Sequence, residues 1–308
     1  IRVEIVNVFY FFSSHVIKQN PPVRIELKKI YRQEDEMFIN LLNRVRINEL
    51  TNADYELLNS QIIQYPDSME NSHVTISTHN QTVDDINSHE LKKVDSQLFE
   101  FRANTTGEFN AENVLAKSLL SLKIGARVMF VKNDVGSFRK FFNGKLGIIK
   151  DFKEDKIIVE CDDGVELEVE RVKWINYTYN FDNNQKKLIQ NEIGVFEQFP
   201  LRLAWAITVH KSQGLTFERI NLDLQNSFDS GQVYVAMSRC TSFDGLNFLS
   251  PIIPEAIKTA PAVLNYSSKV TSPETLNSKP VSRSENSLVI SHLLNYKGFK
   301  RYVNSIPD

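Results

Sequence analysis

Cysteine and tryptophan are scarce in this sequence of 308 residues, which contains two of each. Cys161 and Cys240 have no cysteine or histidine at metal-ligand spacing, which argues against a disulfide scaffold or a zinc site. We therefore predict no metal-binding residues and expect a reducing compartment. A cytoplasmic location follows, in the bacterial cytosol or, in a eukaryote, in the nucleus or mitochondrion.

Long apolar runs and an excess of one charge are also missing. No apolar stretch reaches the roughly 18 residues needed to span a bilayer, and Val8–Phe12 is too short for a signal segment. We expect no membrane partner. The formal net charge is −2, so any nucleic-acid contact would need a local cationic surface. Because the sequence begins at Ile1 in the middle of a pattern, we expect a piece of a longer protein.

The order of helix and strand signals predicts an α/β fold. Helices are expected over 33–46, over 51–60 and after Asn80, and strands over 74–77 and 98–101, with Thr51 and Asp54 as a capping-box pattern and Thr82 with Asp85 as a cap for the third helix. Short β-rich runs follow from about 123, with Asp163-Gly164 as a hairpin turn. Helix and strand signals return between about 200 and 249.

This change from mixed helix and strand signals to β-rich runs and back predicts one domain with a second domain inserted into it. A parallel-sheet domain would comprise residues 1–121 and 200–252, and a small β-barrel would occupy residues 122–199. Residues 253–287 are rich in Ser, Pro and Asn and read as a linker, and residues 288–308 contain enough Leu, Tyr and Phe for one helix.

The most informative segment is the polar turn 208–217, TVHKSQGLTF, which follows the apolar run Leu201–Val209. The run reads as a buried strand of a parallel sheet, and ligands bind at the carboxyl ends of such strands. The turn supplies hydroxyls, a cation and a glycine, which are groups that bind phosphates. Residues 232–239 predict a helix ending at Arg239, and together the two segments indicate a nucleotide-driven motor.

A complete phosphate-binding loop of the form G-x-x-x-x-G-K-[ST] is missing. Gly144-Lys145 is followed by Leu146, and Lys211-Ser212 is preceded by His210. No acidic pair ends a buried strand where it could hold magnesium. The chain by itself is therefore predicted not to hydrolyse ATP.

A basic and aromatic loop, Lys132–Lys145, lies between two of the predicted barrel strands. Such a composition is typical of single-strand binding. The aromatic residues Phe138, Phe141 and Phe142 either stack on bases or clamp onto a neighbouring domain, and both alternatives stay open.

In order and spacing, several motifs resemble a petite-integration-frequency type DNA helicase of the RecD-like branch of superfamily one. They are Tyr31-Arg32-Gln33 with the helix ending at Arg46, Thr78-His79-Asn80, Gly125–Met129 with Asn143-Gly144, Trp205–Thr216 and Gln232–Arg239. The resemblance covers about residues 25–252. It implies the second, C-terminal motor half: a RecA-like parallel-sheet domain with an inserted small β-barrel of the Src-homology type. The first RecA-like domain, which carries the phosphate loop, would lie outside this chain.

The resemblance also implies roles for single residues. Arg32 and Arg239 would reach the γ-phosphate of ATP, with Arg239 as the arginine finger, and Gln213 and Gly214 would lie near the nucleotide. ATP and Mg²⁺ would be held mainly by the missing first domain. Contacts with single-stranded DNA are expected from Thr78, Asn80, His210, Lys211, Ser212, Phe138, Arg139, Lys140, Asn143 and Lys145.

Ordinary structural roles remain alternatives for these residues. Arg239 could complement a helix dipole, His210 could be a buried histidine, and Asn80 could cap the following helix. Two classes of function therefore remain. The first is half of a monomeric 5′ to 3′ DNA helicase for repair, recombination and telomere maintenance, and the second is a non-enzymatic nucleic-acid or protein adaptor.

Overall fold

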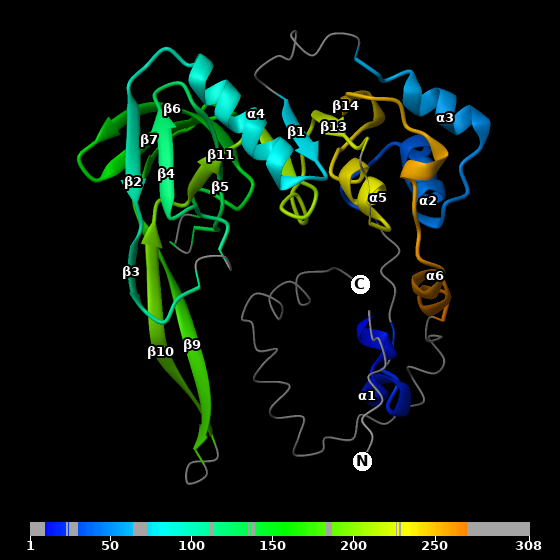
Figure 1. Cartoon of the computed structure of the whole chain (residues 1–308), viewed down its shortest axis with the longest axis horizontal. Helices are drawn as coiled ribbons and strands as arrows, with labels where there is room; N and C mark the ends of the chain where they lie inside the picture. Colours follow the sequence, from blue (N-terminus) through cyan, green and yellow to red (C-terminus); the bar gives the residue numbers. More distant parts are fainter. Residues whose placement is uncertain are drawn as a thin grey trace, which may run out of the picture. The chain divides into compact units, whose positions relative to one another are not determined.

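The computed structural model describes residues 10–22, 24, 30–63, 73–110, 114–134, 136, 139–182, 187–225, 227 and 229–269 (Figure 1). The chain divides into two units, one formed by residues 1–28 and 262–308 and the other by Lys29–Pro261. The described part of the first unit contains η1 (Phe11–Ser13), α1 (His15–Gln19) and nearly all of α6 (Pro261–Ser267). There, Phe12 stacks on Tyr266 with ring centroids 4.3 Å apart.

A four-stranded parallel sheet forms the centre of the second unit, with strand order β12-β1-β13-β14. Its strands are β1 (Val74–Ser77), β12 (Ala206–Thr208), β13 (Ile220–Asp223) and β14 (Leu246–Phe248). β1 pairs in parallel with both β12 and β13, so segments far apart in the sequence share one sheet. All residues of β1 and β12 are buried, as expected for a parallel sheet covered on both faces.

Helices α2 (Glu36–Ile47), α3 (Asn52–Asn59), α4 (Asn80–Lys93) and α5 (Gln232–Met237) accompany this sheet. The predicted capping box is confirmed, because the Thr51 hydroxyl accepts from the Asp54 N–H and the Asp54 carboxylate accepts from the Thr51 N–H. The predicted cap at Thr82 is wrong. α4 already begins at Asn80, after the extended residue His79.

Antiparallel strands form the rest of the second unit. They comprise a five-stranded sheet of order β11-β5-β6-β7-β8, the pair β2-β4 and the sheet β3-β10-β9. Their bounds are β2 Leu98–Arg102, β3 Asn104–Gly107, β4 Leu119–Lys123, β5 Arg127–Phe130, β6 Leu146–Lys153, β7 Lys156–Cys161, β8 Glu166–Val169, β9 Val172–Asp182, β10 Lys187–Gln198 and β11 Leu201–Leu203. The coarse prediction of a mixed α/β fold is confirmed.

The antiparallel part extends past both ends of the expected barrel segment 122–199. β2 pairs with β4, and Phe99 and Phe101 lie against Phe152 with centroids 4.5 and 5.5 Å apart. At the other end, β11 pairs with β5. With β11 added, β5 has a partner strand on each side. The sequence also did not reveal β9 and β10, a long hairpin that extends away from the five-stranded sheet (Figure 1).

The apolar run Leu201–Val209 is two strands, and the prediction of one strand is wrong. β11 is antiparallel to β5, whereas β12 is parallel to β1. Between them, the side chain of Asn87 accepts from the N–H groups of Trp205 and Ala206 and donates to the Ala206 carbonyl. Both strands are buried, so their apolar character could not reveal the break.

The prediction of a linker over 253–287 is wrong for its first residues. Ala256 and Ile257 are buried in the same apolar core as the parallel sheet, and the Gly231 N–H donates to the Lys258 carbonyl at 2.8 Å. These apolar side chains pack against the core and keep the segment ordered on it. Residues from 270 onward, including the predicted helix in 288–308, lie outside the described residues.

Candidate functional site

Two arginines from distant parts of the sequence meet beside the end of α5. Arg32 donates from Nε to Thr216 Oγ1 at 2.9 Å and from Nη1 to the Ser238 carbonyl at 3.0 Å. Arg239 donates from Nε to the Val235 carbonyl and from Nη2 to Ser238 Oγ, both at 2.9 Å. The bond to Val235 is the helix-end contact that the structural alternative for Arg239 predicts. Both arginines remain half-buried, so part of each is open to a ligand.

The electrostatics of this arginine pair suit an anion. Burial, and then the positive charge of Arg32, lower the pKa of Arg239. Within the described ranges, neither guanidinium has a carboxylate at salt-bridge distance. Two uncompensated cations held together by hydrogen bonds would be stabilised by phosphate oxygens, which accept bidentate bonds from guanidinium groups.

Gln33 holds the backbone on both sides of Arg239. Its Nε2 donates to the carbonyls of Ser238 and Cys240 at 3.1 and 2.7 Å, and the side chain is buried. The Arg239 carbonyl accepts from the Phe217 N–H at 3.0 Å. Gln33 was not among the predicted site residues, although the position of Gln33 next to Arg32 was a signal for it.

The polar turn 208–217 exposes His210, Gln213 and Gly214. The structural alternative of a buried His210 is therefore wrong. Gly214 has φ +83°, a left-handed conformation that favours glycine. Gln213 and Gly214 precede Thr216, which contacts Arg32, so the turn reaches the arginine pair.

Ser212 corrects the predicted set of DNA contacts. Its side chain has no exposed surface, and its hydroxyl donates to the Val209 carbonyl at 2.7 Å. A phosphate could not reach this hydroxyl in the structure. The prediction of a direct contact is therefore wrong, and Ser212 instead holds the turn that presents its neighbours.

Lys211 belongs to a cluster of cations that the sequence analysis did not identify. Burial, and then the charge of Arg202, lower the pKa of Lys211, with Lys117 acting in the same direction and Asp84 opposing. Lys117 pairs with Asp84 at 2.9 Å. Arg202 is 4% exposed, and its Nε and Nη1 have no hydrogen-bond partner among the described residues. A charged residue inside the apolar run 201–209 was the sequence signal for this cluster.

Thr78 and Asn80 lie at the same edge of the sheet as the polar turn. Ser77 pairs with Thr208, so the segments that follow β1 and β12 leave the sheet side by side. Thr78 is nearly buried, with Oγ1 2.8 Å from His79 Nδ1. Asn80 is exposed and is the first helical residue of α4, so the alternative that it caps this helix is wrong.

The basic loop 132–145 folds largely on itself. The Asp134 carboxylate accepts from the N–H groups of Gly136 and Lys140 at 2.8 and 2.9 Å, and these bonds lower the pKa of Asp134. Arg139 and Lys140 are exposed, and Arg139 has φ +43°. Phe138 lies outside the described residues.

Other predicted loop residues contact the five-stranded antiparallel sheet or its connections. Phe141 stacks on Phe130 of β5 with centroids 4.5 Å apart, so its ring packs against the apolar core of the five-stranded sheet. Lys145 pairs with Asp163 at 2.8 Å and its side chain is only 12% exposed. The Asn143 N–H donates to Asn133 Oδ1 at 2.7 Å. Phe142, at 60% exposure, is the aromatic side chain that this part of the loop leaves open.

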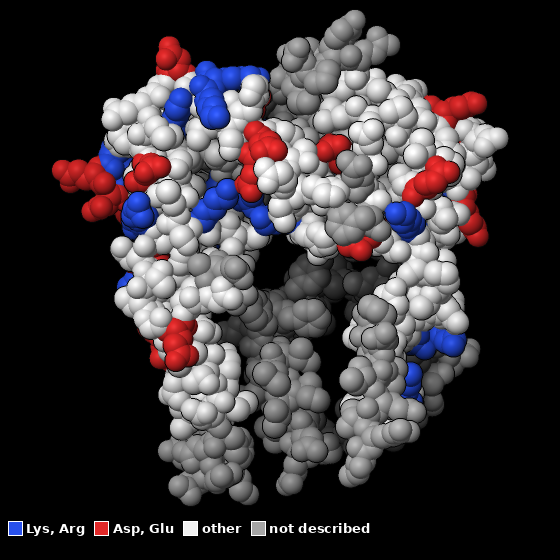
Figure 2. All heavy atoms as spheres, viewed as in Figure 1, with Lys and Arg blue, Asp and Glu red and all other residues white. Residues whose placement is uncertain are grey.

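Charge on the second unit is mixed rather than uniform. On the face shown in Figure 2, basic and acidic side chains are interspersed, in keeping with the net charge of −2. The described residues contain no group of three or more His, Cys, Asp or Glu side chains that could hold a metal ion. They also contain no helix long and apolar enough to cross a membrane.

The sequence of this chain is similar to those of known DNA helicases. The human ATP-dependent DNA helicase PIF1 is 31% identical over 266 residues, which cover 83% of this chain and 39% of that protein. The Pif1 helicase of Campylobacter jejuni is 28% identical over 258 residues, covering 79% of this chain and 57% of that protein. No family model matches the sequence.

Solved structures agree with these relatives. Bacteroides Pif1 in complex with ADP-AlF4 has a TM-score of 0.76 and 34% identity, covering 86% of this chain and 60% of that one. The same Bacteroides helicase bound to single-stranded DNA has a TM-score of 0.62 at 34% identity, with the same coverage.

These sequence and structure matches are to ATP-dependent DNA helicases of the Pif1 type. This chain belongs to the Pif1 family, which confirms the resemblance seen in the sequence. The chain spans between 39% and 57% of the length of the human and C. jejuni relatives.

Proposed function

We propose that this chain is the second, C-terminal motor half of a Pif1-family helicase. It binds single-stranded DNA and supplies arginines to ATP held mainly by a first motor domain. In this proposal the parallel sheet with α2–α5 is the RecA-like domain, and the antiparallel sheets include the inserted Src-homology-type barrel. The observation that carries the proposal is the pair Arg32 and Arg239, which meets at Ser238 and has no carboxylate at salt-bridge distance among the described residues.

The arginine pair fits the triphosphate of ATP. The ADP-AlF4 complex of the Bacteroides relative supports a site for nucleotide in this fold. ATP supplies the γ-phosphoryl group that is transferred to water. Arg239 would stabilise the charge that develops on that group, and Arg32 would hold the same phosphate while bonded to Thr216 and Ser238. Gln213 and Gly214 would border the nucleotide, and Mg²⁺ would be held by the first domain.

The carboxyl edge of the parallel sheet is the proposed DNA surface. Thr78, Asn80, His210 and Lys211 would contact the sugar-phosphate backbone, which positions a strand without reading its sequence. The complex of Bacteroides Pif1 with single-stranded DNA supports this ligand. Because the polar turn joins this surface to the arginine pair through Thr216, DNA contact and ATP turnover would be coupled. Monomeric state, 5′ to 3′ polarity, intracellular location and roles in repair, recombination and telomere maintenance stay predictions.

The proposal is tested with a protein that joins this chain to a Pif1-family first motor domain. DNA-stimulated ATP hydrolysis should fall about 10³-fold or more in Arg239→Ala, as for other arginine fingers. Single-stranded DNA affinity should stay at the parental value. Arg219→Ala, at an exposed arginine in the same region, is the matched control. If Arg239→Ala hydrolyses ATP at the parental rate, Arg239 is not the arginine finger.

The chain by itself provides the second half of the test. It should bind single-stranded DNA and show no ATP hydrolysis, because it contains no phosphate loop. If the joined protein also binds DNA without hydrolysing ATP, the adaptor function replaces the motor function.

A further inference from the structure

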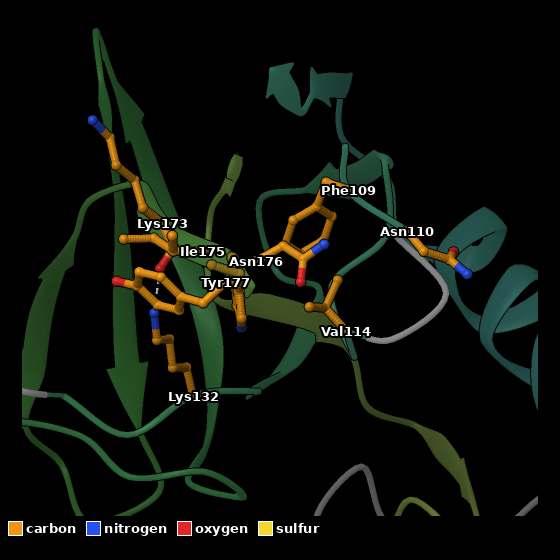
Figure 3. A pocket seen from close by; sticks show the side chains of 9 residues that line it. Phe109, Asn110, Val114, Lys132, Lys173, Ile175, Asn176 and Tyr177 are labelled. Atoms are coloured by element: carbon orange, nitrogen blue, oxygen red, sulfur yellow. Dashed lines mark hydrogen bonds between the residues drawn. The ribbon is translucent and has the colours of Figure 1, made fainter. Parts of the chain in front are cut away.

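A pocket lies along the free edge of β9, and none of its lining residues belongs to the arginine pair or the polar turn. Its volume is ≈ 450 Å³, within the range of small-ligand pockets. Figure 3 shows Phe109 and Val114 approaching from the segment after β3, opposite side chains of β9, with Lys132 entering from the segment after β5. β9 is the outer strand of its sheet. Its consecutive residues Lys173–Tyr177 all line the pocket, so side chains from both of its faces contribute.

The pocket wall is partly aromatic and held in place. Phe109 stacks on Phe196 with centroids 5.5 Å apart, and Trp174 meets Phe196 edge to face at 5.7 Å. Tyr177 and Ile175 remain 39% and 36% exposed. Fixed aromatic side chains next to exposed ones form a surface on which a planar base can stack.

Lys132 adds a positive charge to this wall. Its ammonium lies 4.8 Å from the Trp174 ring centroid. It also donates to the Lys173 carbonyl (Figure 3). Burial lowers the pKa of Lys132. Among the described residues, no carboxylate lines the pocket, and Lys173 pairs with Glu197 at 3.9 Å. A cation beside an aromatic wall complements a ligand that is anionic at one end and flat at the other.

The pocket is close to the proposed DNA surface along the chain. Val114 lines the pocket, and Lys117, three residues later, belongs to the cluster around Lys211. Three extended residues span at most about 11 Å. A strand in contact with Lys117 can therefore continue into the pocket within a few nucleotides.

We propose that this pocket binds one nucleotide unit of single-stranded DNA, with the base against Trp174 and a phosphate on Lys132. The inference rests on the proposed function. A free nucleotide has the same chemistry and is a separate arm of the test. An extended peptide pairing with the edge of β9 fits less well, because Lys132 already occupies the Lys173 carbonyl that such pairing would use.

The chain contains two tryptophans, which gives a direct signal. Trp205 is 8% exposed in the core, whereas Trp174 lines the pocket. Titration of the 308-residue chain with oligothymidylate should therefore quench the emission of Trp174. In Trp174→Phe the quenching should vanish, while fluorescence anisotropy still reports binding. Saturation by thymidine monophosphate at equal nucleotide concentration would instead identify a free-nucleotide site and overturn the proposal.

Lys132→Gln tests the phosphate contact without removing an aromatic side chain. The slope of log affinity against log salt should become less negative by about 0.7, the value for one phosphate on a single strand. Lys150→Gln, at a lysine paired with Glu160 on the barrel, should leave the slope unchanged. Melting curves check that each variant is folded.

The outcomes separate this inference from the proposed function. The pocket proposal alone would be overturned if DNA leaves Trp174 emission unquenched and Lys132→Gln leaves the salt slope unchanged, while Lys211→Ala still weakens DNA binding. Absence of any DNA binding by the parental chain would overturn both.

Discussion

Arg32 Nη1 donates a hydrogen bond to the carbonyl oxygen of Ser238 at 3.0 Å, so one guanidinium is tied to the residue immediately before the other. Arg32 therefore has two tasks at once: it contributes charge and it fixes the backbone from which Arg239 projects.

The first prediction separates these two tasks of Arg32. In the protein joined to a first motor domain, Arg32→Ala should lower ATP turnover by orders of magnitude. Arg32→Lys keeps the charge but lacks the planar fork that bonds Thr216 and Ser238 together, so its turnover should be intermediate. Steady-state ATPase assays with saturating DNA measure both. Equal rates for Arg32→Lys and the parent would mean that charge alone matters.

Gln33 should act on turnover through position alone. Gln33→Met keeps the approximate volume but leaves the carbonyls of Ser238 and Cys240 without this donor, at a cost of about 1 to 3 kcal/mol in unfolding free energy. ATP turnover should fall at temperatures where the variant is fully folded, whereas DNA affinity should not change. Denaturant unfolding and ATPase assays on the same sample provide the two readouts. A stability loss with parental turnover would limit Gln33 to a structural role.

Lys211 and Ser212 are neighbours with opposite expected behaviour. Single-stranded DNA binding to the chain should show a salt slope of roughly −2 to −3 if three or four phosphates are contacted, and Lys211→Ala should reduce its size by about 0.7. Ser212→Ala should leave the slope unchanged and lower stability by about 1 kcal/mol, because its buried hydroxyl holds the turn. Anisotropy titrations at several salt concentrations, paired with melting curves, distinguish them. A loss of DNA affinity in folded Ser212→Ala would instead support the direct contact that the burial of this hydroxyl argues against.

Asp54 should contribute to acid sensitivity. The hydrogen bond from Arg44 is the main cause that lowers its pKa to about 2; desolvation opposes it, and bonds from Thr51 assist. Because the folded-state pKa lies below the ordinary value, this stabilisation is present above about pH 4 and is lost as the pH falls toward 2. Asp54→Asn should cost about 1 to 2 kcal/mol at pH 7, since Arg44 is partly exposed. Its stability should also vary less between pH 4 and pH 2 than that of the parent, as urea unfolding at each pH would reveal.

Two adjacent phenylalanines test the basic loop. Phe141→Ala should lower the melting temperature, because its ring stacks on Phe130 inside the barrel. Phe142 is 60% exposed, so Phe142→Ala should leave stability unchanged. If Phe142 stacks on a base, the same change should weaken single-stranded DNA binding by about 1 to 3 kcal/mol. Unchanged affinity would exclude Phe142 from the DNA surface.

Local sequence patterns predicted much of the secondary structure. The apolar spacing of Phe38, Leu41, Leu42 and Val45 was sufficient for α2, and the Thr51-Asp54 pattern for the start of α3. These elements depend on contacts within one or two helical turns, which is why a short stretch of sequence specifies them. The order and spacing of the motifs were sufficient for the Pif1 family.

Tertiary structure alone decided which side chains meet. Arg32 and Ser238 are far apart in the sequence, and no periodicity joins them. The break at Trp205 depends on hydrogen bonds that its N–H and that of Ala206 donate to the side chain of Asn87 on α4, and the burial of Ser212 depends on packing around its turn. Such contacts follow from long-range packing, in which each residue's surroundings are set by segments that the local pattern does not include. The sequence by itself therefore determined the helices, most strands and the family, whereas the arginine pair, the cation cluster around Arg202 and the pocket beside β9 arise only when the sheets are assembled.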